Sequence, residues 1–318
     1  MRQNYLFFQS SRETLDEITE LFDFLWPTAA AMWNLRWQVD GYLRVRPQAT
    51  VHELSNRFVI GSEIHGANIK KACVDLTWEQ QQENFAKFLL INIFALYESH
   101  LSRLLDDLNC SSRALEKQFQ FPTTIDVTGN KRGIWNAIET ITSSESTMLK
   151  NGFYAQLAGH SKNSKAILDN LLKCYRYFKE CRNTFAHNGC IAGQNTVSAY
   201  SEFVAVATET DLGVSEVPQH APIIQGAPVR LMIRGVVGLS DIIRKIIITI
   251  DAELSRSQEA ERIFKRYWLG KYKSRYNLKT DATRCRKQIK RLISGLNLPK
   301  PESTNEFETF LRSNRLAH

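Results

Sequence analysis

The sequence lacks the cysteine pairs that mark a disulfide framework or a zinc site. Its six cysteines are scattered over 318 residues without any Cys-x2-Cys spacing. Reduced thiols in a cytoplasm fit this distribution better than disulfides do. Cys174, Cys181, His187 and Cys190 lie close together in the sequence, but their spacing matches no usual zinc pattern. We therefore expect no bound metal, no other cofactor and a cytoplasmic location.

A long hydrophobic run is also missing. The longest apolar stretch, Phe88 to Tyr97, is interrupted by Asn92 and is about half the length of a bilayer span. The first nine residues hold no sustained apolar segment of the kind that opens a secretion signal. We expect a soluble protein with no membrane partner, and 43% hydrophobic residues supply material for a packed core.

Several catalytic signatures are absent as well. The chain has no Gly-rich phosphate-binding loop, no nucleophile elbow and no His-Glu-x-x-His motif. These absences disfavour a nucleotide triphosphatase, a serine hydrolase and a zinc peptidase. Internal repeats are not evident either, so the chemistry has to be sought in individual polar residues.

Apolar residues at helical spacing predict a mainly α-helical fold. Ser10-x-x-Glu13 resembles a capping box at the start of a helix that Pro27 should end. A second helix should follow from about residue 28 to 43, closed by Pro47, and residues 50–75 are predicted as helix and loop. The longest pattern runs from Thr77, as the cap, to Leu108. Its inward-facing residues are predicted to be Phe85, Phe88, Leu89, Ile93, Leu96, Leu101, Leu104 and Leu105.

Later segments continue this pattern and add a small hairpin. Shorter helices are predicted at 112–119 and 133–141, and longer ones at 164–187 and 239–254. Gly189 is a natural stop for the helix at 164–187. Residues 196–208 and 229–234 alternate between apolar and polar side chains and are rich in Val and aromatic residues, so we expect them to pair as strands.

Arg182, Asn183 and His187 at the end of the helix at 164–187 form the candidate catalytic group. RNA cleavage without metal needs a group that shuttles protons near neutral pH and a fixed cation, which histidine and arginine supply. The two residues lie about 140° apart around a helix, whereas Asn183 and His187 share a face. Asn183 is thus placed to orient the imidazole or hold a phosphate oxygen. Glu98, inside the helix at 77–108, is a possible supporting residue that could reach a buried arginine.

An arginine followed by a histidine after four to six intervening residues occurs twice more in the chain. Arg46 to His52 contains Pro47, which opposes a continuous helix, and Arg312 to His318 lies in the last residues. Only Arg182 to His187 closes a long amphipathic helix with a polar residue directly after the arginine. A purely structural alternative stays open, in which the histidine complements the helix dipole and the arginine forms a surface ion pair.

With these residues, the chain resembles the HEPN superfamily, whose motif is Arg-x4-6-His with a polar residue, often Asn, after the arginine. The resemblance rests on Glu180 to Gly189, on Phe94 to Leu101 in the preceding long helix, and on the element order over residues 77–255. It implies a HEPN-like helical bundle with a small β-hairpin there, flanked by helical extensions at 1–76 and 256–318. It also implies a homodimer whose motif helices pair across a twofold axis, with two Arg and two His lining one cleft.

The segment from Glu261 to Ser294 holds twelve basic and two acidic residues, a net charge of +10 in a chain of net charge +8. Tyr267, Trp268, Tyr272 and Tyr276 are interleaved with these charges, a combination suited to phosphate contact and base stacking. The alternative is a solvated surface helix. The candidate RNA-binding residues are Arg262, Lys265, Arg266, Lys271, Lys273, Arg275, Arg284, Arg286, Lys287, Lys290 and Arg291.

Together these features predict a metal-independent endoribonuclease that cleaves RNA by 2′-OH attack. Since many HEPN proteins are toxins or phage-defence effectors, the resemblance implies such a role and an antitoxin or defence-system protein as a partner. One alternative is a non-catalytic HEPN-like module that binds nucleic acid or protein. Another is the toxin-side partner of a nucleotidyltransferase antitoxin.

Overall fold

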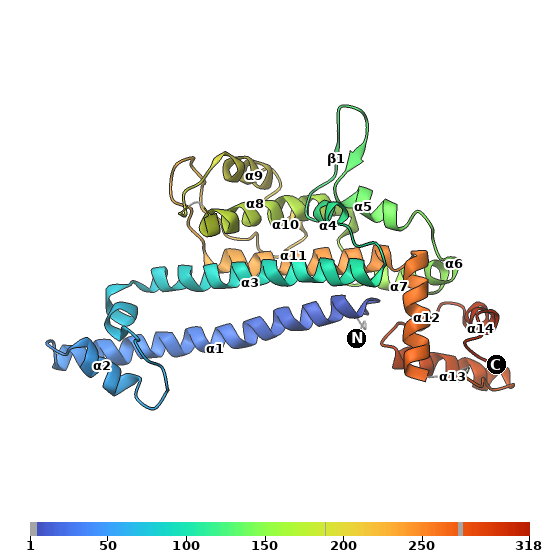
Figure 1. The fold of residues 1–318 in the computed structure, drawn as a ribbon, viewed down its shortest axis with the longest axis horizontal. Coiled ribbons are helices and arrows are strands. Elements are labelled where there is room, and N and C mark those ends of the chain that lie inside the picture. The colour runs from blue at the N-terminus through green and yellow to red at the C-terminus, as the bar shows by residue number, and fades with distance from the viewer. Residues whose placement is uncertain (1–4, 188, 273–275) are drawn as a thin grey trace.

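The structure is a computed structural model that describes residues 5–187, 189–272 and 276–318. It is mainly α-helical with a small two-stranded antiparallel sheet, as the sequence predicts. Three long helices, α1 (Gln9–Val45), α3 (Trp78–Asp107) and α11 (Ile233–Leu254), pack along one another, and α8 (Leu168–His187) lies against α3 and α11 (Figure 1). These four helices form the body of the molecule.

Shorter elements surround this body. α2 and the turn η1 lie at one end, whereas α12, α13 and α14 lie at the other (Figure 1). The remaining bounds are α2 (Val51–Phe58), η1 (Lys71–Asp75), α4 (Arg113–Gln118), β1 (Thr124–Ile125), β2 (Lys131–Arg132), α5 (Ile134–Ile141), α6 (Thr147–Leu149), η2 (Lys150–Tyr154), α7 (Ala155–Ala158), η3 (Lys165–Ile167), α9 (Gln194–Val204), α10 (Glu209–Leu212), α12 (Gln258–Tyr272), α13 (Ala282–Gly295) and α14 (Thr304–Ser313).

The predicted helix break at Pro27 is wrong, because α1 continues through this residue to Val45. A proline inside a helix removes one hydrogen bond and crowds the carbonyl one turn earlier. Pro27 and Asp23 are both exposed, so the freed carbonyl of Asp23 is open to water. Packing of α1 along α3 then holds the helix together past the proline. The helix does end before Pro47, as predicted.

The predicted capping box at Ser10 is also wrong. The helix begins one residue earlier, and Phe8 precedes it without any side-chain cap. Instead, the backbone N–H groups of Phe7 and Phe8 donate to the carboxylate of Asp251 on α11, at 2.7 and 2.9 Å. Burial raises the pKa of Asp251 to about 6, and the two hydrogen bonds oppose that rise. A partner so distant in sequence leaves no local signal at the helix start.

The long helix α3 matches its prediction closely. Thr77 caps it through a capping box with Gln80, and its buried face includes most of the predicted inward residues. Phe85 and Leu96 are partly buried. Phe88 is 44% exposed and lies beside Phe24 of α1, with the ring centroids 6.4 Å apart. By length and composition α3 could cross a membrane, but half of its most apolar stretch is buried inside the protein.

The small hairpin exists, but not where the sequence analysis placed it. Residues 196–208 fall largely in helix α9, with Thr196, Ala199 and Phe203 buried at helical spacing, and residues 229–232 lead straight into α11. The strands are β1 and β2, paired Thr124 to Arg132 and Ile125 to Lys131. Alternating residues over a short segment fit one face of a helix as well as a strand, and here the helical period applies.

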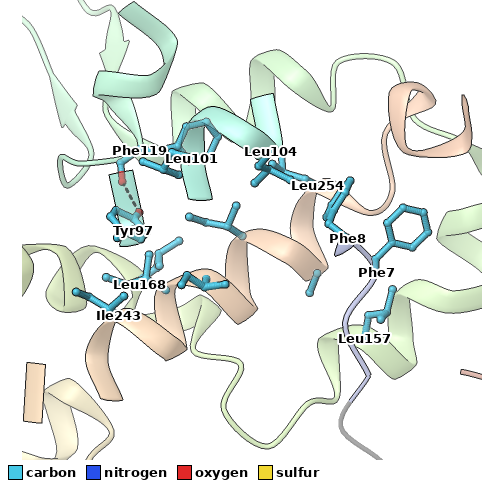
Figure 2. Packing of buried hydrophobic residues seen from close by; sticks show 14 of the residues in the cluster. Phe7, Phe8, Tyr97, Leu101, Leu104, Phe119, Leu157, Leu168, Ile243 and Leu254 are labelled. Carbon is cyan, nitrogen blue, oxygen red and sulfur yellow. Dashed lines mark hydrogen bonds between the residues drawn. The ribbon is translucent and has the colours of Figure 1, made fainter. Parts of the chain in front are cut away.

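One hydrophobic core connects the two ends of the chain. Figure 2 shows Phe7 and Phe8 lying near Leu157 and Leu254, so the N-terminal residues are part of the same packing as α11. The phenol of Tyr97 is also buried there and donates to the carbonyl oxygen of Phe119 at 3.0 Å. A second, smaller cluster lies under α2 and η1 and contains Val39, Ala49, Leu54, Ile69 and Cys73.

Candidate active site

The motif residues lie in the last turns of α8, as predicted. This helix forms because Leu171, Tyr175, Phe178 and Cys181 recur at intervals of three and four and are all buried against α3, α9 and α11. It stops at His187, and Gly189 follows with φ +57°, a conformation that favours glycine. The end of the helix therefore places the motif at the surface of the bundle.

Arg182 is held in place by the long helix α3. Its guanidinium forms an ion pair with Glu98, with the nitrogen and oxygen 3.2 Å apart, and donates to the side-chain oxygen of Asn183 at 3.2 Å. The side chain of Arg182 is 25% exposed, so the group is partly buried and yet open on one side. The predicted contact between Glu98 and an arginine is confirmed.

Lys179 shares the carboxylate of Glu98 with Arg182. Its ammonium lies 3.1 Å from the second oxygen of Glu98 and also donates to Gln120. Burial lowers the pKa of Lys179, Glu98 opposes that shift, and the positive charges of Arg176 and Arg182 add to it. Two cations therefore depend on one carboxylate, which leaves this face of α8 with an excess of positive charge.

The side chain of Asn183 contacts Arg182 rather than His187. Its oxygen accepts from Arg182, and its amide nitrogen lies 3.5 Å from a carboxylate oxygen of Glu180. In the part of the chain that the structure describes, no hydrogen bond joins Asn183 to His187. The predicted orientation of the imidazole by Asn183 is therefore not seen within one chain.

His187 is exposed and has no hydrogen bond or ion pair with any described residue. The turn before it is anchored by Phe185, whose ring centroid lies 5.1 Å from the ammonium of Lys87 on α3. Positions 182 and 187 point about 140° apart around the helix axis. A single chain thus supplies both residue types without bringing them to one reacting atom.

Four basic residues predicted to bind RNA lie on α12, where each is already engaged. Such surface contacts are weak, but they lower the charge available to a ligand. Arg262 pairs with Glu259, Lys265 with Glu261 and Arg266 with Asp107, while Lys271 donates to the carbonyl of Gly295. Lys273 and Arg275 lie outside the described residues.

The basic residues of α13 are different. They are all exposed, and none has an ion pair or side-chain hydrogen bond with a described residue. The opposite face of α13 packs into the core through Cys285, Ile289, Leu292 and Ile293. The exposed cations, which we call the α13 basic face, are Arg284, Arg286, Lys287, Lys290 and Arg291.

The predicted role in base stacking is wrong for Trp268, whereas Tyr267, Tyr272 and Tyr276 are only partly buried. Trp268 is fully buried, and its indole N–H donates to the carbonyl of Leu316 at 3.0 Å. The partly buried Tyr272 donates from its hydroxyl to the carbonyl of Leu292 at 2.6 Å, while Tyr267 and Tyr276 pack against the same core. These rings attach α12 to α13 and the C-terminal segment, and alternation with basic residues is what an amphipathic helix also produces.

The α13 basic face is remote from the motif. The N–H of Val229 donates to the carbonyl of Cys190 at 2.8 Å, so α11 starts beside the end of α8. From there α11 runs the length of the bundle to α12 and α13 (Figure 1). At 1.5 Å per residue, its 22 residues span about 33 Å.

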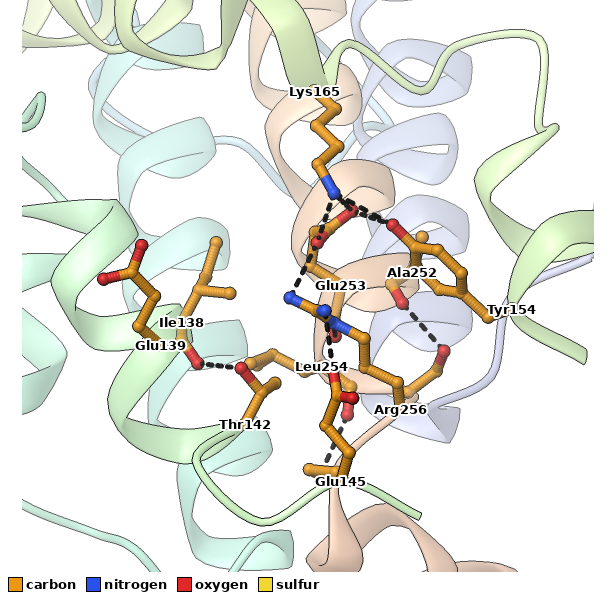
Figure 3. A network of polar contacts seen from close by, with 12 residues as sticks. Ile138, Glu139, Thr142, Glu145, Tyr154, Lys165, Ala252, Glu253, Leu254 and Arg256 are labelled. Carbon is orange, nitrogen blue, oxygen red and sulfur yellow. Dashed lines mark hydrogen bonds and ion pairs between the residues drawn. The ribbon is translucent and has the colours of Figure 1, made fainter. Parts of the chain in front are cut away.

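A second cluster of charged residues, which the sequence analysis missed, surrounds Glu253 (Figure 3). This fully buried carboxylate accepts from Tyr154 at 2.6 Å and pairs with Lys165 at 2.9 Å and Arg256 at 3.3 Å. Burial and the hydrogen bond to Glu253 raise the pKa of Tyr154, so its hydroxyl stays a donor. Since Glu253 is fully partnered, the cluster joins η2, η3 and α11 and offers no open position for a ligand.

No group of three or more His, Cys, Asp or Glu side chains that could hold a metal ion occurs among the described residues. Cys174 and Cys181 are buried in the core, and burial raises the pKa of Cys181 to about 12.

Comparisons with protein-family models, with curated proteins and with solved structures find no match for this chain. The residues of the chain offer a fixed guanidinium, an exposed imidazole and, at the other end of the bundle, a face of cations without partners among the described residues.

Proposed function

We propose that this protein is a metal-independent endoribonuclease of the HEPN kind in which Arg182 and His187 act on the RNA. The observation that carries the proposal is the contrast between the two groups at the end of α8. Glu98 and Asn183 hold the guanidinium, whereas the imidazole is exposed and unpartnered among the described residues. A fixed cation and an accessible proton carrier are what cleavage by 2′-OH attack requires.

In this reaction the 2′-oxygen bonds to the adjacent phosphorus and the bond to the 5′-oxygen breaks. His187 takes the proton from the 2′-OH or gives one to the departing 5′-oxygen. Arg182 stabilises the negative charge that gathers on the phosphate oxygens. The products carry a 2′,3′-cyclic phosphate and a 5′-OH, and no oxidant, metal or cofactor enters the balance.

A second copy of the chain completes the site in this proposal. Because the two residues point to different sides of α8, Arg182 of one copy would act with His187 of the other across a twofold axis. The surface at this end carries partly exposed apolar residues: Ile191 is 41% exposed and Met232 is 42% exposed. Such residues suit a contact between copies.

The α13 basic face serves the same RNA at a distance in this proposal. Because α11, about 33 Å long, lies between it and the motif, this face cannot contact the reacting phosphate but can attract a long RNA and hold a remote part of it. A toxin or anti-phage effector needs no more than this broad attraction, and such a protein would be controlled by an antitoxin or another defence-system protein.

The alternative function is a non-catalytic module that binds RNA or another acidic partner. The observation that favours it is again the α13 basic face, since five unpaired cations can bind an anion without any chemistry. In that case Arg182 and Glu98 would only join α8 to α3, and His187 would only complement the dipole of α8.

Incubation of the purified protein with total RNA in EDTA separates these functions. The parent is expected to cleave RNA and leave 2′,3′-cyclic phosphate ends, and the His187→Ala variant is expected to leave the RNA intact. His65→Ala is the matched control, because His65 is also exposed but lies in the loop between α2 and η1. Equal cleavage by all three proteins, or activity that returns only with added magnesium, would contradict the proposal.

A further inference from the structure

A cavity of about 570 Å³ opens between α4, the β-hairpin, α8 and α9. Three cations border it, Lys117 from α4, Arg132 from β2 and Arg176 from α8, against one carboxylate, Glu202 of α9. Its volume lies in the range of sites that enclose a small molecule, about 300–1,000 Å³. The lining therefore combines the size of a ligand site with three cations and one carboxylate, while Asp126 and Glu180 beside it pair with two of these cations.

Two of these cations are available to an anion. Lys117 is exposed and has no ion pair with a described residue. The side chain of Arg132 is 71% exposed and has one surface ion pair, with Asp126 at 3.0 Å. A phosphate has to compete with Asp126 for Arg132, as it would for the paired cations of α12, and surface pairs of this kind are weak.

The third cation forms a flat surface in the wall of the cavity. The guanidinium of Arg176 lies 4.1 Å from the ring centroid of Phe121 and is fixed by Glu180 at 2.6 Å. Proteins bind the bases of single-stranded RNA by stacking on aromatic rings and on guanidinium planes. Asn195 and Ser198 on α9 also line the cavity and are exposed, so their side chains can hydrogen-bond the edge of a base.

A series of side-chain contacts connects this cavity with the motif. Glu180 holds Arg176 and also approaches Asn183, which accepts from Arg182. From position 176 to 182 the helix axis advances about 9 Å. Stacked nucleotides rise about 3.4 Å each, so two to three of them cover this distance. The two positions are also about 120° apart around the axis, so a strand seated in the cavity has to curve around α8 to reach Arg182.

The larger cavity beside the start of α3, of about 710 Å³, lacks this charge excess. Its walls hold Arg230 and Arg234 but also Glu79 and Glu83. Four charges of balanced sign do not attract a polyanion. The smaller cavity is therefore the better site for a phosphate-bearing ligand.

We propose that the cavity bordered by Lys117, Arg132 and Arg176 binds one nucleotide of the single-stranded RNA substrate, close to the position where Arg182 meets the cleaved phosphate. This inference rests on the proposed ribonuclease function, because it names where that substrate is held. In this proposal the cavity positions a particular nucleotide, and the α13 basic face attracts the rest of the RNA.

The test measures binding of a short fluorescent single-stranded RNA by anisotropy, in EDTA and in the His187→Ala background. Lys117→Gln combined with Arg132→Gln should weaken binding at least about tenfold, since hydrogen bonds between charged groups are lost. The slope of log affinity against log salt should flatten by about 1.4, or 0.7 for each lost phosphate contact. Glu202→Gln should act in the opposite direction and tighten binding, because it removes the one carboxylate.

Lys70→Gln combined with Lys71→Gln is the matched control, since it removes the same charge from two exposed lysines near η1. If the variant with Lys117→Gln and Arg132→Gln binds RNA as tightly as this control variant, the inference is overturned. Failure of the proposed function is seen separately, as cleavage that survives His187→Ala. A protein that loses binding in the cavity variant but cleaves without His187 would keep the nucleotide site and lose the catalytic assignment.

Discussion

The end of α8 and the outer face of α13 both gather positive charge, but they are built in opposite ways. On α8 the cations are partly buried and tied to carboxylates, with Arg182 and Lys179 sharing Glu98. On α13 five cations are exposed to solvent and have no partners among the described residues. Fixed groups suit the stabilisation of a particular transition state, whereas unpaired exposed groups suit long-range attraction. In the proposed function, the end of α8 serves the reaction and the α13 basic face attracts the RNA.

The largest effect is expected at His187. His187→Ala should lower RNA cleavage by about 10²–10⁴-fold, the contribution of a positioned proton carrier. The free energy of unfolding should change by less than about 0.5 kcal/mol, because the side chain is exposed. Cleavage assays and thermal melts of the two proteins check this. Unfolding of the variant would instead assign His187 a structural role.

Arg182 should follow closely. Arg182→Lys keeps the charge but loses the planar fork, and we expect cleavage to fall by about 10²-fold. The comparison variant is Arg176→Lys, which changes the same residue type six positions earlier on α8 and should alter RNA binding more than the rate of the bound complex. Single-turnover kinetics at saturating RNA distinguish the two. Equal loss of rate in both variants would mean that Arg182 has no special part in the reaction.

On α13 the expected effect concerns binding and not chemistry. Changing Arg284, Arg286, Lys287 and Arg291 together to Gln should weaken binding of long RNA and flatten its salt slope by about 2.8, at 0.7 per contact for a single strand. Cleavage of a short RNA should stay near the parent rate. The matched control changes the four engaged cations of α12 to Gln, namely Arg262, Lys265, Arg266 and Lys271.

The α12 variant removes the same four positive charges as the α13 variant. The two variants therefore differ in whether the removed cations had ion-pair or hydrogen-bond partners among the described residues. A smaller loss of affinity in the α12 variant than in the α13 variant is the expected result. Equal losses would show that net charge alone attracts the RNA, and the distinction between engaged and free cations would fail.

The smallest effect is expected at Lys179. Burial lowers the pKa of its ammonium relative to the unfolded chain, so the unfolded state binds more protons between the two values. The contribution of Lys179 to the free energy of unfolding therefore rises as the pH rises from the pKa of Lys179 in the folded state toward its pKa in the unfolded chain. Lys179→Met should remove that rise, seen as a difference in denaturant midpoint between variant and parent that changes with pH above neutrality. A difference in denaturant midpoint that does not change with pH would contradict the lowered pKa of Lys179.

The long helices were predictable because local rules decide them. Thr77 with Gln80 caps α3, and the spacing of apolar residues together with Gly189 sets the length of α8. The predicted break at Pro27 failed because an exposed proline can be tolerated when a neighbouring helix supports the chain. The strand predicted at 196–208 failed because Thr196, Ala199 and Phe203 follow a helical period that a short alternating segment conceals.

The candidate site was predictable only in its residue types. Glu98 was expected to reach an arginine, and it does. The sharing of Glu98 with Lys179, the link from Lys179 to Gln120 and the cluster around Glu253 were not expected, because these partners are distant in sequence and meet only through packing. The position of α13 relative to the motif depends in the same way on the length and direction of α11.

The central claim is that Arg182 of one copy acts with His187 of another, and mixing two inactive variants tests it most directly. Arg182→Ala and His187→Ala proteins are unfolded together, refolded as a mixture and assayed for RNA cleavage in EDTA. A mixed dimer holds one cleft with an intact arginine from one copy and an intact histidine from the other. The account predicts cleavage at least about tenfold above either variant alone, since the proton carrier is restored. A mixture that stays as inactive as its components at every ratio, beside an active parent treated in the same way, would contradict it.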